Sequence, residues 1–374
     1  MHIIQIAPVI GPGSGVAGVV WNLEREFIAR GHTVERFTAV DARRRPRRRQ
    51  SRFMPIRALT LLGDAVGFST IGAVRAKRFT SERPGAVTIC HNGPLFGDIY
   101  VNHGVIGAAM QARGNAAIRM LRNPTHVFTH LRDLYRYRGT THRAVVALTR
   151  RDAATLAEIY GRVRPPVHVI PHGVELSTYR PPTAAERTDV RAEFQLTDEH
   201  RVALFVGHEF ERKGADIAIR ALTEAKTVML LLVGGNQKTI ADAQALADTL
   251  GVAGRVRFAG RRSDIVPLLW ACDMLVLPSA YESFGLVITE ALATGVPVVS
   301  TPVGCAPDLI VDGRNGYVVR RNPQAFAEAM ERIAALPQGA WRDAAAETVE
   351  TCGWDRTADR YLELLRSLAG AEAA

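Results

Sequence analysis

The chain has 374 residues, of which 47% are apolar and 22% are charged, and its formal net charge is +10 at pH 7. This length suits two domains that each bury a core, and the composition excludes collagen, coiled coil and wholesale disorder. Lys and Arg outnumber Asp and Glu by 27 to 11 in residues 1–180, whereas Asp and Glu outnumber Lys and Arg by 26 to 20 in residues 181–374. The basic character therefore belongs to the first half of the chain.

The cysteines and the apolar runs bear on the compartment. Cys90, Cys272, Cys305 and Cys352 form no C-x-x-C pair, so we predict neither a zinc site nor a secreted disulfide framework. The residues after Met1 lack the pattern of a signal peptide. A long stretch without charge, residues 291–307, is interrupted by Gly and Pro and does not predict a spanning helix. We expect a cytoplasmic protein that meets a membrane only at its surface.

Short apolar runs alternate with helical patterns along the chain, which is typical of parallel α/β units. In the first half we expect strands at residues 3–7, 34–38, 87–91, 99–103, 144–149 and 167–171. In the second half we expect strands at 203–207, 227–234, 255–259, 274–278 and 296–301, with helices such as 216–223 and 240–250 between them. The chain therefore reads as an α/β protein with two doubly wound sheets.

Proline and arginine clusters indicate how these halves are joined. Pro181 and Pro182 stiffen the chain and prevent a helix from crossing it, so we predict domains at 1–178 and 179–353 with a hinge between them. Residues 354–374 predict an amphipathic helix that crosses back to the first domain. Residues 43–52 hold seven arginines in ten positions and predict a basic surface loop.

A glycine-rich loop follows the first predicted strand. Gly11, Gly13 and Gly15 precede a helix that ends at Arg30-Gly31-His32, and small residues here let an anion approach the helix N-terminus. The spacing differs from G-x-G-x-x-G. The loop therefore binds a phosphate or sugar, or it only turns the chain.

The first strand of the second half ends in Gly207-His208 and is followed by the adjacent cations Arg212 and Lys213. Cations at the carboxyl end of a parallel strand are placed to meet a ligand, and a diphosphate needs both positive charge and hydrogen-bond donors. The alternative is a solvated pair at the tip of a loop.

Two glutamates, Glu282 and Glu290, lie eight residues apart after a later strand. Ser283-Phe284-Gly285 is expected to open a helix whose free amides hold phosphate, with Glu290 about two turns inside it. One carboxylate can then face a sugar while the other reaches a ribose. Two exposed helix glutamates are the alternative, although the flanking residues are apolar.

With these motifs in this order, the chain resembles the family-4 retaining glycosyltransferases of the GT-B fold over nearly its whole length. The matching pieces include the glycine loop, a His at the end of two middle strands, residues 170–174, the loop 207–214, Gly234-Gly235 and the E-x7-E stretch. The loop 207–214 looks most like that of bacterial enzymes that add glucose to the lipopolysaccharide core. The resemblance implies two Rossmann-like domains that face each other across a cleft.

The resemblance also implies a UDP-sugar or GDP-sugar donor that lies mainly against the second domain. Lys213 would meet the diphosphate, Glu282 the hydroxyls of the transferred sugar and Glu290 the ribose. The phosphates would contact the backbone amides of Ser283, Phe284, Gly285 and Leu286. In the first domain, Ser14 and Gly15 would lie near the diphosphate, His103 near the donor sugar, and His91 beside it or in the acceptor pocket. His103, Lys213 and Glu282 are the predicted catalytic residues.

One departure from the family pattern concerns the cations. Most members have an arginine directly after the glycine, where this chain has His208, so Arg212 is the candidate that replaces it. We expect transfer to depend on electrostatic stabilisation of the leaving nucleoside diphosphate. The chain has no D-x-D motif, so we expect neither a required metal ion nor any other cofactor.

Alternatives remain for the reaction and for the basic residues. The same fold also serves nucleotide-sugar epimerases, and an arginine-rich loop can bind nucleic acid through phosphates, although no nucleic-acid-binding motif accompanies it and no such partner is expected. Basic residues continue through the first domain, so we predict a glycan or glycolipid acceptor and docking on the anionic inner face of the plasma membrane, against the alternative of a solvated surface. They are Arg57, Arg75, Lys77, Arg78, Arg113, Arg119, Arg122, Arg132, Arg136, Arg138 and Arg143.

Overall fold

The computed structural model describes residues 1–13, 15–42 and 54–373, without the side chains of 54–58 and 371–373. The predicted basic loop at 43–52 and Ser14 lie outside the described residues. The chain divides into two compact units, of which the first is Met1–His172 together with Trp354–Ala374 and the second is Gly173–Gly353. The second unit begins before the predicted boundary at residue 179 because Val174 already pairs with Gly353, and its amide donates to the Cys352 carbonyl at 2.9 Å.

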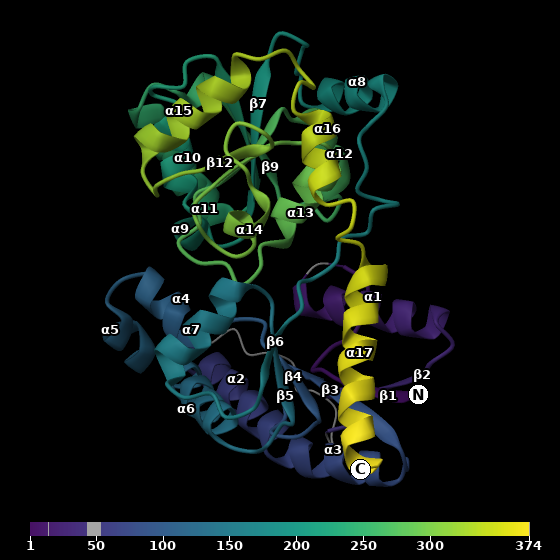
Figure 1. Cartoon of the computed structure of the whole chain (residues 1–374). Coiled ribbons are helices and arrows are strands. Elements are labelled where there is room, and N and C mark those ends of the chain that lie inside the picture. The colour runs from purple at the N-terminus through teal and green to yellow at the C-terminus, as the bar shows by residue number, and fades with distance from the viewer. Residues whose placement is uncertain (14, 43–53, 374) are drawn as a thin grey trace. The chain divides into compact units, whose positions relative to one another are not determined.

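The first unit contains a parallel sheet of six strands in the order β2-β1-β3-β4-β5-β6 (Figure 1). The strands are β1 His2–Ile6, β2 Thr33–Phe37, β3 Ala86–His91, β4 Ile99–Val101, β5 Ala144–Ala147 and β6 Val167–Val169. All six predicted strands are confirmed, although β4 ends two residues before His103. Parallel strands are covered by helices on both faces, which is why their apolar runs were visible in the sequence.

Eight helices are described in the first unit. They are α1 Gly15–Ala29, α2 Met54–Ser69, α3 Ile71–Ser81, α4 Ile106–Ala112, α5 Ala116–Leu121, α6 Pro124–Arg138, α7 Arg150–Tyr160 and α17 Trp354–Ala373. None of the described helices of the chain is both long enough and apolar enough to cross a membrane.

The terminal helix α17 belongs to the first unit, where it packs against α1 (Figure 1). Its apolar stripe buries Tyr361, Leu362 and Leu365. Arg30, at the end of α1, donates from Nε to the Asp359 carboxylate at 2.7 Å and from Nη2 to the Asp355 carbonyl at 2.9 Å. Helix α17 is thus fixed to α1.

One of the basic residues assigned to the surface is not on it. Arg136 on α6 is fully buried, with Nη1 donating to Asp133 at 2.8 Å and Nη2 donating to the Gly93 carbonyl at 2.8 Å. Its guanidinium also lies 3.7 Å from the centroid of the Tyr100 ring. The prediction that Arg136 contributes to the basic surface was wrong, because this arginine neutralises a buried carboxylate instead.

The second unit contains another parallel sheet of six strands, in the order β12-β11-β10-β7-β8-β9. The strands are β7 Arg201–Gly207, β8 Val228–Gly234, β9 Val256–Gly260, β10 Met274–Leu277, β11 Val298–Ser300 and β12 Gly316–Val318. Five of them were predicted. The edge strand β12 was missed because it has only three residues and begins at a glycine, so no apolar run marks it.

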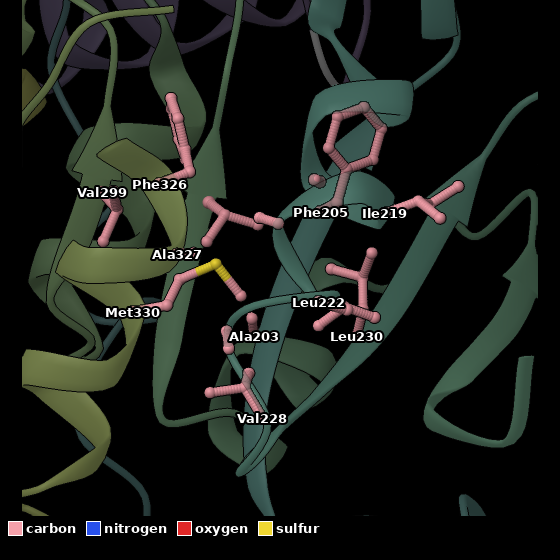
Figure 2. Packing of buried hydrophobic residues seen from close by; sticks show 14 of the residues in the cluster. Ala203, Phe205, Ile219, Leu222, Val228, Leu230, Val299, Phe326, Ala327 and Met330 are labelled. Atoms are coloured by element: carbon pink, nitrogen blue, oxygen red, sulfur yellow. The ribbon is translucent and has the colours of Figure 1, made fainter. Parts of the chain in front are cut away.

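Helices cover both faces of this sheet as well. They are α8 Ala184–Glu193, α9 Phe210–Lys213, α10 Ala215–Ala221, α11 Gln237–Thr249, α12 Ile265–Ala271, α13 Leu286–Ala293, α14 Ala306–Leu309, α15 Pro323–Ala334 and α16 Arg342–Thr348, together with a 3-10 turn at Ala253–Arg255. Figure 2 shows the core on one face, where Phe326 and Met330 of α15 and Leu222 after α10 pack against β-strand side chains such as Phe205.

This packing leads to a stability prediction. Phe326 is fully buried, so Phe326→Ala should lower the free energy of unfolding by about 3–5 kcal/mol through lost burial and a residual cavity. Urea denaturation followed by circular dichroism measures the loss. Leu336→Ala is the control because Leu336 is 43% exposed, and its effect should stay within about 0.5 kcal/mol. Equal losses for the two variants would contradict this account of the core.

Candidate functional site

The loop after β7 places two cations at the carboxyl edge of the second sheet. β7 ends at Gly207, and the single turn of α9 ends in Arg212 and Lys213. Phe210 of the same turn is buried, and its ring meets the Phe205 ring edge-on with 5.6 Å between centroids. The turn is therefore fixed to the core, which fixes the starting points of both cationic side chains.

Both cations converge on one carboxylate. β10 lies beside β7 in the sheet, and the loop that follows it carries Ser279 and Glu282 to the same edge. Oε1 of Glu282 lies 3.1 Å from Lys213 Nζ and 3.1 Å from Arg212 Nη1, and it accepts a hydrogen bond from Ser279 Oγ at 2.6 Å. All three contacts use Oε1, so Oε2 lies outside them. We call Arg212, Lys213 and Glu282 the cation–carboxylate cluster.

The cluster is largely screened from water, with side-chain exposures of 16%, 16% and 12% for Arg212, Lys213 and Glu282. Burial alone would raise the pKa of Glu282, but Lys213, Arg212 and the Ser279 hydroxyl outweigh it, so that the pKa lies below its ordinary value. Glu282 is therefore ionised at neutral pH. Arg212 Nε also lies 3.4 Å from Glu209 Oε2, but the Glu209 side chain is 53% exposed. The three largely buried side chains therefore carry two positive charges and one negative charge.

Two glycines make the close contacts of this edge possible. A Cβ added to Gly207 would lie 2.3 Å from Lys213 Cδ, so the lysine stem passes directly over the glycine. Gly304 has a φ of +53°, and a Cβ there would lie 2.1 Å from the Phe284 carbonyl oxygen. That carbonyl accepts from the Cys305 amide at 2.8 Å. The 304–305 loop thus holds the segment that follows Glu282.

The segment with the predicted phosphate-binding amides has a different helix boundary from the one expected. α13 begins at Leu286, with Gly285 as its N-cap at φ +85°, so Ser283 and Phe284 precede the helix. Glu290 lies just over one turn inside α13, and the predicted two turns were wrong. The Ile288 amide donates to the Gly285 carbonyl at 2.8 Å, while the amides of Leu286 and Val287 have no acceptor within the helix. Phe284 is buried and anchors the segment.

Glu290 lies beside a residue from the chain segment that enters the second unit. The side chains of Tyr179 and Glu290 lie close enough to influence each other's pKa. Burial raises the pKa of Glu290 to about 7, while the Tyr179 hydroxyl and the charge of Lys213 act in the opposite direction. Tyr179 contacts a carboxylate that the resemblance assigns to the ribose.

Other predicted residues are not members of the cluster. His208 follows β7 directly and is exposed. Gly15 is the first residue of α1 in the first unit, and a Cβ added to Gly13 or Gly15 would meet nothing within 4 Å. Ser14 lies outside the described residues. The structure describes each unit by itself.

In the first unit the structure brings His103 together with two further histidines. His91 Nδ1 and His103 Nε2 are 2.9 Å apart, and the imidazole of His103 stacks on that of His172 with 5.3 Å between centroids. Burial lowers the pKa of His103 to about 3. Burial, reinforced by mutual repulsion, also lowers the pKa values of His91 and His172. All three imidazoles are therefore neutral at physiological pH.

Three contacting residues escaped the sequence analysis. Ser279 could have been found from its Ser-x-x-Glu spacing to Glu282, which often brings a hydroxyl to a carboxylate. Gln5, which contacts His91, could have been found as a lone polar residue within the apolar strand β1. Tyr179 had no local signal because Glu290 is distant in sequence. Within the described residues, no group of three or more His, Cys, Asp or Glu side chains is arranged to hold a metal ion.

Comparison with known proteins agrees with this architecture. Residues 186–348 match the family described as "Glycosyl transferases group 1". The D-inositol 3-phosphate glycosyltransferase of Xylanimonas cellulosilytica is 34% identical over 233 residues, which are 59% of this chain and 56% of that protein. The chain thus spans little more than half the length of the curated relatives it matches.

Solved structures extend the likeness over both units. Sucrose-phosphate synthase from Thermosynechococcus elongatus has a TM-score of 0.79 at 21% identity and covers 99% of this chain and 100% of its own. WaaG, a glycosyltransferase involved in lipopolysaccharide biosynthesis, has a TM-score of 0.74 at 19% identity, with 97% and 99% covered. Anabaena HepE in complex with UDP-glucose has a TM-score of 0.67 at 19% identity, with 98% and 99% covered.

The two parallel six-stranded sheets with their helices, together with these structural neighbours, define the protein as one of the GT-B fold. Within this fold, residues 186–348 match the group 1 glycosyl transferase family. Both the fold and the resemblance expected from the sequence are confirmed.

The raised pKa of Glu290 predicts a pH-dependent stability. Between the ordinary pKa of 4.5 and about 7, the folded chain keeps a proton that the unfolded chain loses, so stability falls as the pH rises through this window. Glu290→Gln removes this dependence. Between about pH 4.5 and about pH 8, the free energy of unfolding of the variant should therefore rise by on the order of 2–3 kcal/mol relative to that of the wild type. Urea unfolding at several pH values measures the difference, and a constant difference would contradict the assignment.

Proposed function

We propose that the protein is a retaining glycosyltransferase that moves a hexose from a UDP-sugar or GDP-sugar to a hydroxyl of a lipid-linked or surface-glycan acceptor. The observation that carries the proposal is the convergence of Arg212 and Lys213 on Glu282 at the carboxyl edge of the second sheet. Ligands of open parallel sheets bind at this edge. The family match over residues 186–348 supports the same reaction class.

The cation–carboxylate cluster has the chemistry to receive a sugar diphosphate. Its excess positive charge suits a diphosphate, and Arg212 supplies the guanidinium that is absent at His208. Since Oε1 of Glu282 already meets both cations and Ser279, Oε2 is the atom we assign to a sugar hydroxyl. Glu282 therefore orients the cations and the sugar at once. The first-turn amides of α13 and the backbone after Glu282 add donors for the phosphates.

In the proposed reaction, the acceptor oxygen forms a bond to the anomeric carbon while the bond from that carbon to the diphosphate oxygen breaks. The acceptor hydroxyl passes its proton to the departing diphosphate oxygen, and the nucleoside diphosphate leaves from the face that the acceptor enters. Negative charge grows on the leaving diphosphate, and Arg212 and Lys213 stabilise it in a site that largely excludes water. These residues require no cofactor for that step.

Glu290 recognises the ribose in this proposal. Its carboxyl group accepts a hydrogen bond from a ribose hydroxyl more strongly when it is ionised, and its pKa of about 7 places this change near neutral pH. Tyr179, from the segment that leads from Gly173 to α8, lies beside this carboxylate. The nucleoside and the diphosphate are thus bound by two neighbouring segments of the second unit.

The acceptor belongs to the first unit, where His103 contributes to the sugar site. Helices α5 and α6, which contact each other, expose the apolar side chains Ile118, Leu121, Leu131 and Tyr135, and Arg122 and Arg138 are exposed on the same helices or at their ends. Apolar groups flanked by arginine suit an anionic bilayer. We assign this face to reversible docking at the cytoplasmic surface of the plasma membrane.

Substitutions in the cluster test the transfer reaction. Lys213→Ala and Glu282→Ala should each keep the fold and lower kcat/KM by at least about a hundred-fold, because each removes a group that stabilises the departing diphosphate or positions the sugar. Initial rates with each UDP-sugar and GDP-sugar and a lipid-linked acceptor measure the loss. The matched control is Lys226→Ala, an exposed lysine of the same unit, which should keep its rate.

Two results would overturn this assignment. Full activity of both cluster variants with the productive substrate pair would remove the cluster from the reaction. An altered nucleotide-sugar formed without any acceptor would identify an epimerase instead of a transferase.

Docking has its own test. Co-sedimentation with phosphatidylcholine vesicles should rise with added phosphatidylglycerol and fall with salt, because arginines near a surface contribute about 1 kcal/mol each. The double substitution Arg122→Glu with Arg138→Glu should reduce binding about ten-fold or more. Arg220→Glu, at an exposed position of α10 in the second unit, should leave binding unchanged. Binding that ignores both anionic lipid and salt would contradict the docking face.

A further inference from the structure

A chain of hydrogen bonds connects His103 to the first strand through two fully buried side chains. Gln5 Nε2 donates to the Val20 carbonyl of α1 at 3.0 Å, and Gln5 Oε1 lies 3.1 Å from His91 Nε2. His91 Nδ1 in turn lies 2.9 Å from His103 Nε2. Gln5 and His91 are both 0% exposed, so water does not compete for these contacts.

The direction of each hydrogen bond in this chain follows from its first member. A backbone carbonyl only accepts, so the amide nitrogen of Gln5 must face Val20 and its oxygen must face His91. His91 Nε2 must then carry a proton, and in a neutral imidazole Nδ1 is left as an acceptor. His103 Nε2 must donate to that acceptor. The lone pair of His103 therefore lies on Nδ1.

We propose that Gln5 is a positioning residue that fixes His103 as the neutral Nε2–H tautomer. The two titratable groups that face His103 are His91, from β3, and His172, from the segment after β6. Both are neutral histidines, and Trp354 of α17, whose ring centroid lies 6.1 Å from that of His172, adds no charge. No neighbouring carboxylate is found here among the described residues to draw a second proton onto the pair.

The fixed tautomer determines what His103 can bind. Nδ1 can accept a hydrogen bond but cannot donate one, and His103 is partly exposed, while no partner for Nδ1 is found within the described residues. His103 therefore suits a hydroxyl group, which donates a proton, and disfavours a phosphate oxygen, which can only accept. This inference rests on the proposed function. In it, His103 accepts a hydrogen bond from a sugar hydroxyl, and the cation–carboxylate cluster binds the diphosphate.

The tautomer can be read directly from 15N-histidine-labelled protein. Long-range 1H–15N correlation spectra at neutral pH distinguish a protonated ring nitrogen from an unprotonated one. In the wild type, His91 and His103 should each show a protonated Nε2 and an unprotonated Nδ1, with His103 assigned by the loss of its signals in His103→Gln. Gln5→Met removes both ends of the amide at similar volume, and His103 should then show a mixture of tautomers.

The matched control is Thr88→Val. Thr88 is buried on β3, the strand of His91, but its hydroxyl bonds to Asp98 instead, so the histidine signals should not change. A protonated Nδ1 on His103 of the wild type, or an unchanged single tautomer in Gln5→Met, would overturn the proposal. If Gln5→Met does not fold, the wild-type spectrum still decides. The spectra need neither the nucleotide-sugar nor the glycosyl acceptor, so this result is independent of the transfer assay.

Discussion

A largely buried carboxylate, that of Glu282, is the constraint on which the candidate site depends. An ionised group away from water is costly unless opposite charges and hydrogen bonds compensate it. Arg212, Lys213 and Ser279 provide that compensation through one oxygen atom. Because the cations are held by a carboxylate, they are already oriented before a ligand arrives. The glycine at 207 is required for the same reason, since any side chain there would displace the stem of Lys213.

The two units solve the problem of buried polar groups in different ways. The second unit balances charges within the cation–carboxylate cluster and leaves a positive excess, which suits a polyanionic ligand. The first unit keeps three histidines neutral and connects two of them to the backbone through Gln5. Neutral groups with fixed donors and acceptors suit hydroxyl groups instead. A nucleotide-sugar contains both kinds of group, charged phosphates and neutral hydroxyls.

The sequence predicted eleven of the twelve strands because buried parallel strands are continuous apolar runs. It also predicted that Arg212, Lys213 and Glu282 contribute to one site, since two motifs followed strands of one sheet. Contacts between residues remote in sequence were not accessible. Tyr179 meets Glu290, and Gln5 meets His91, only because the chain folds. Arg136 was misplaced for the same reason, because its burial depends on Gly93 and Tyr100, which are remote in sequence.

The central claim is that the cation–carboxylate cluster binds a nucleoside diphosphate sugar. Thermal unfolding of the full chain with a panel of UDP-, GDP-, ADP- and TDP-sugars tests it most directly, because a ligand that binds only the folded state raises Tm. The account predicts that a UDP-sugar or GDP-sugar raises Tm in the wild type, and that Arg212→Ala with Lys213→Ala abolishes the increase. A panel without any stabilising nucleotide-sugar, or an equal increase in the double variant, would contradict it.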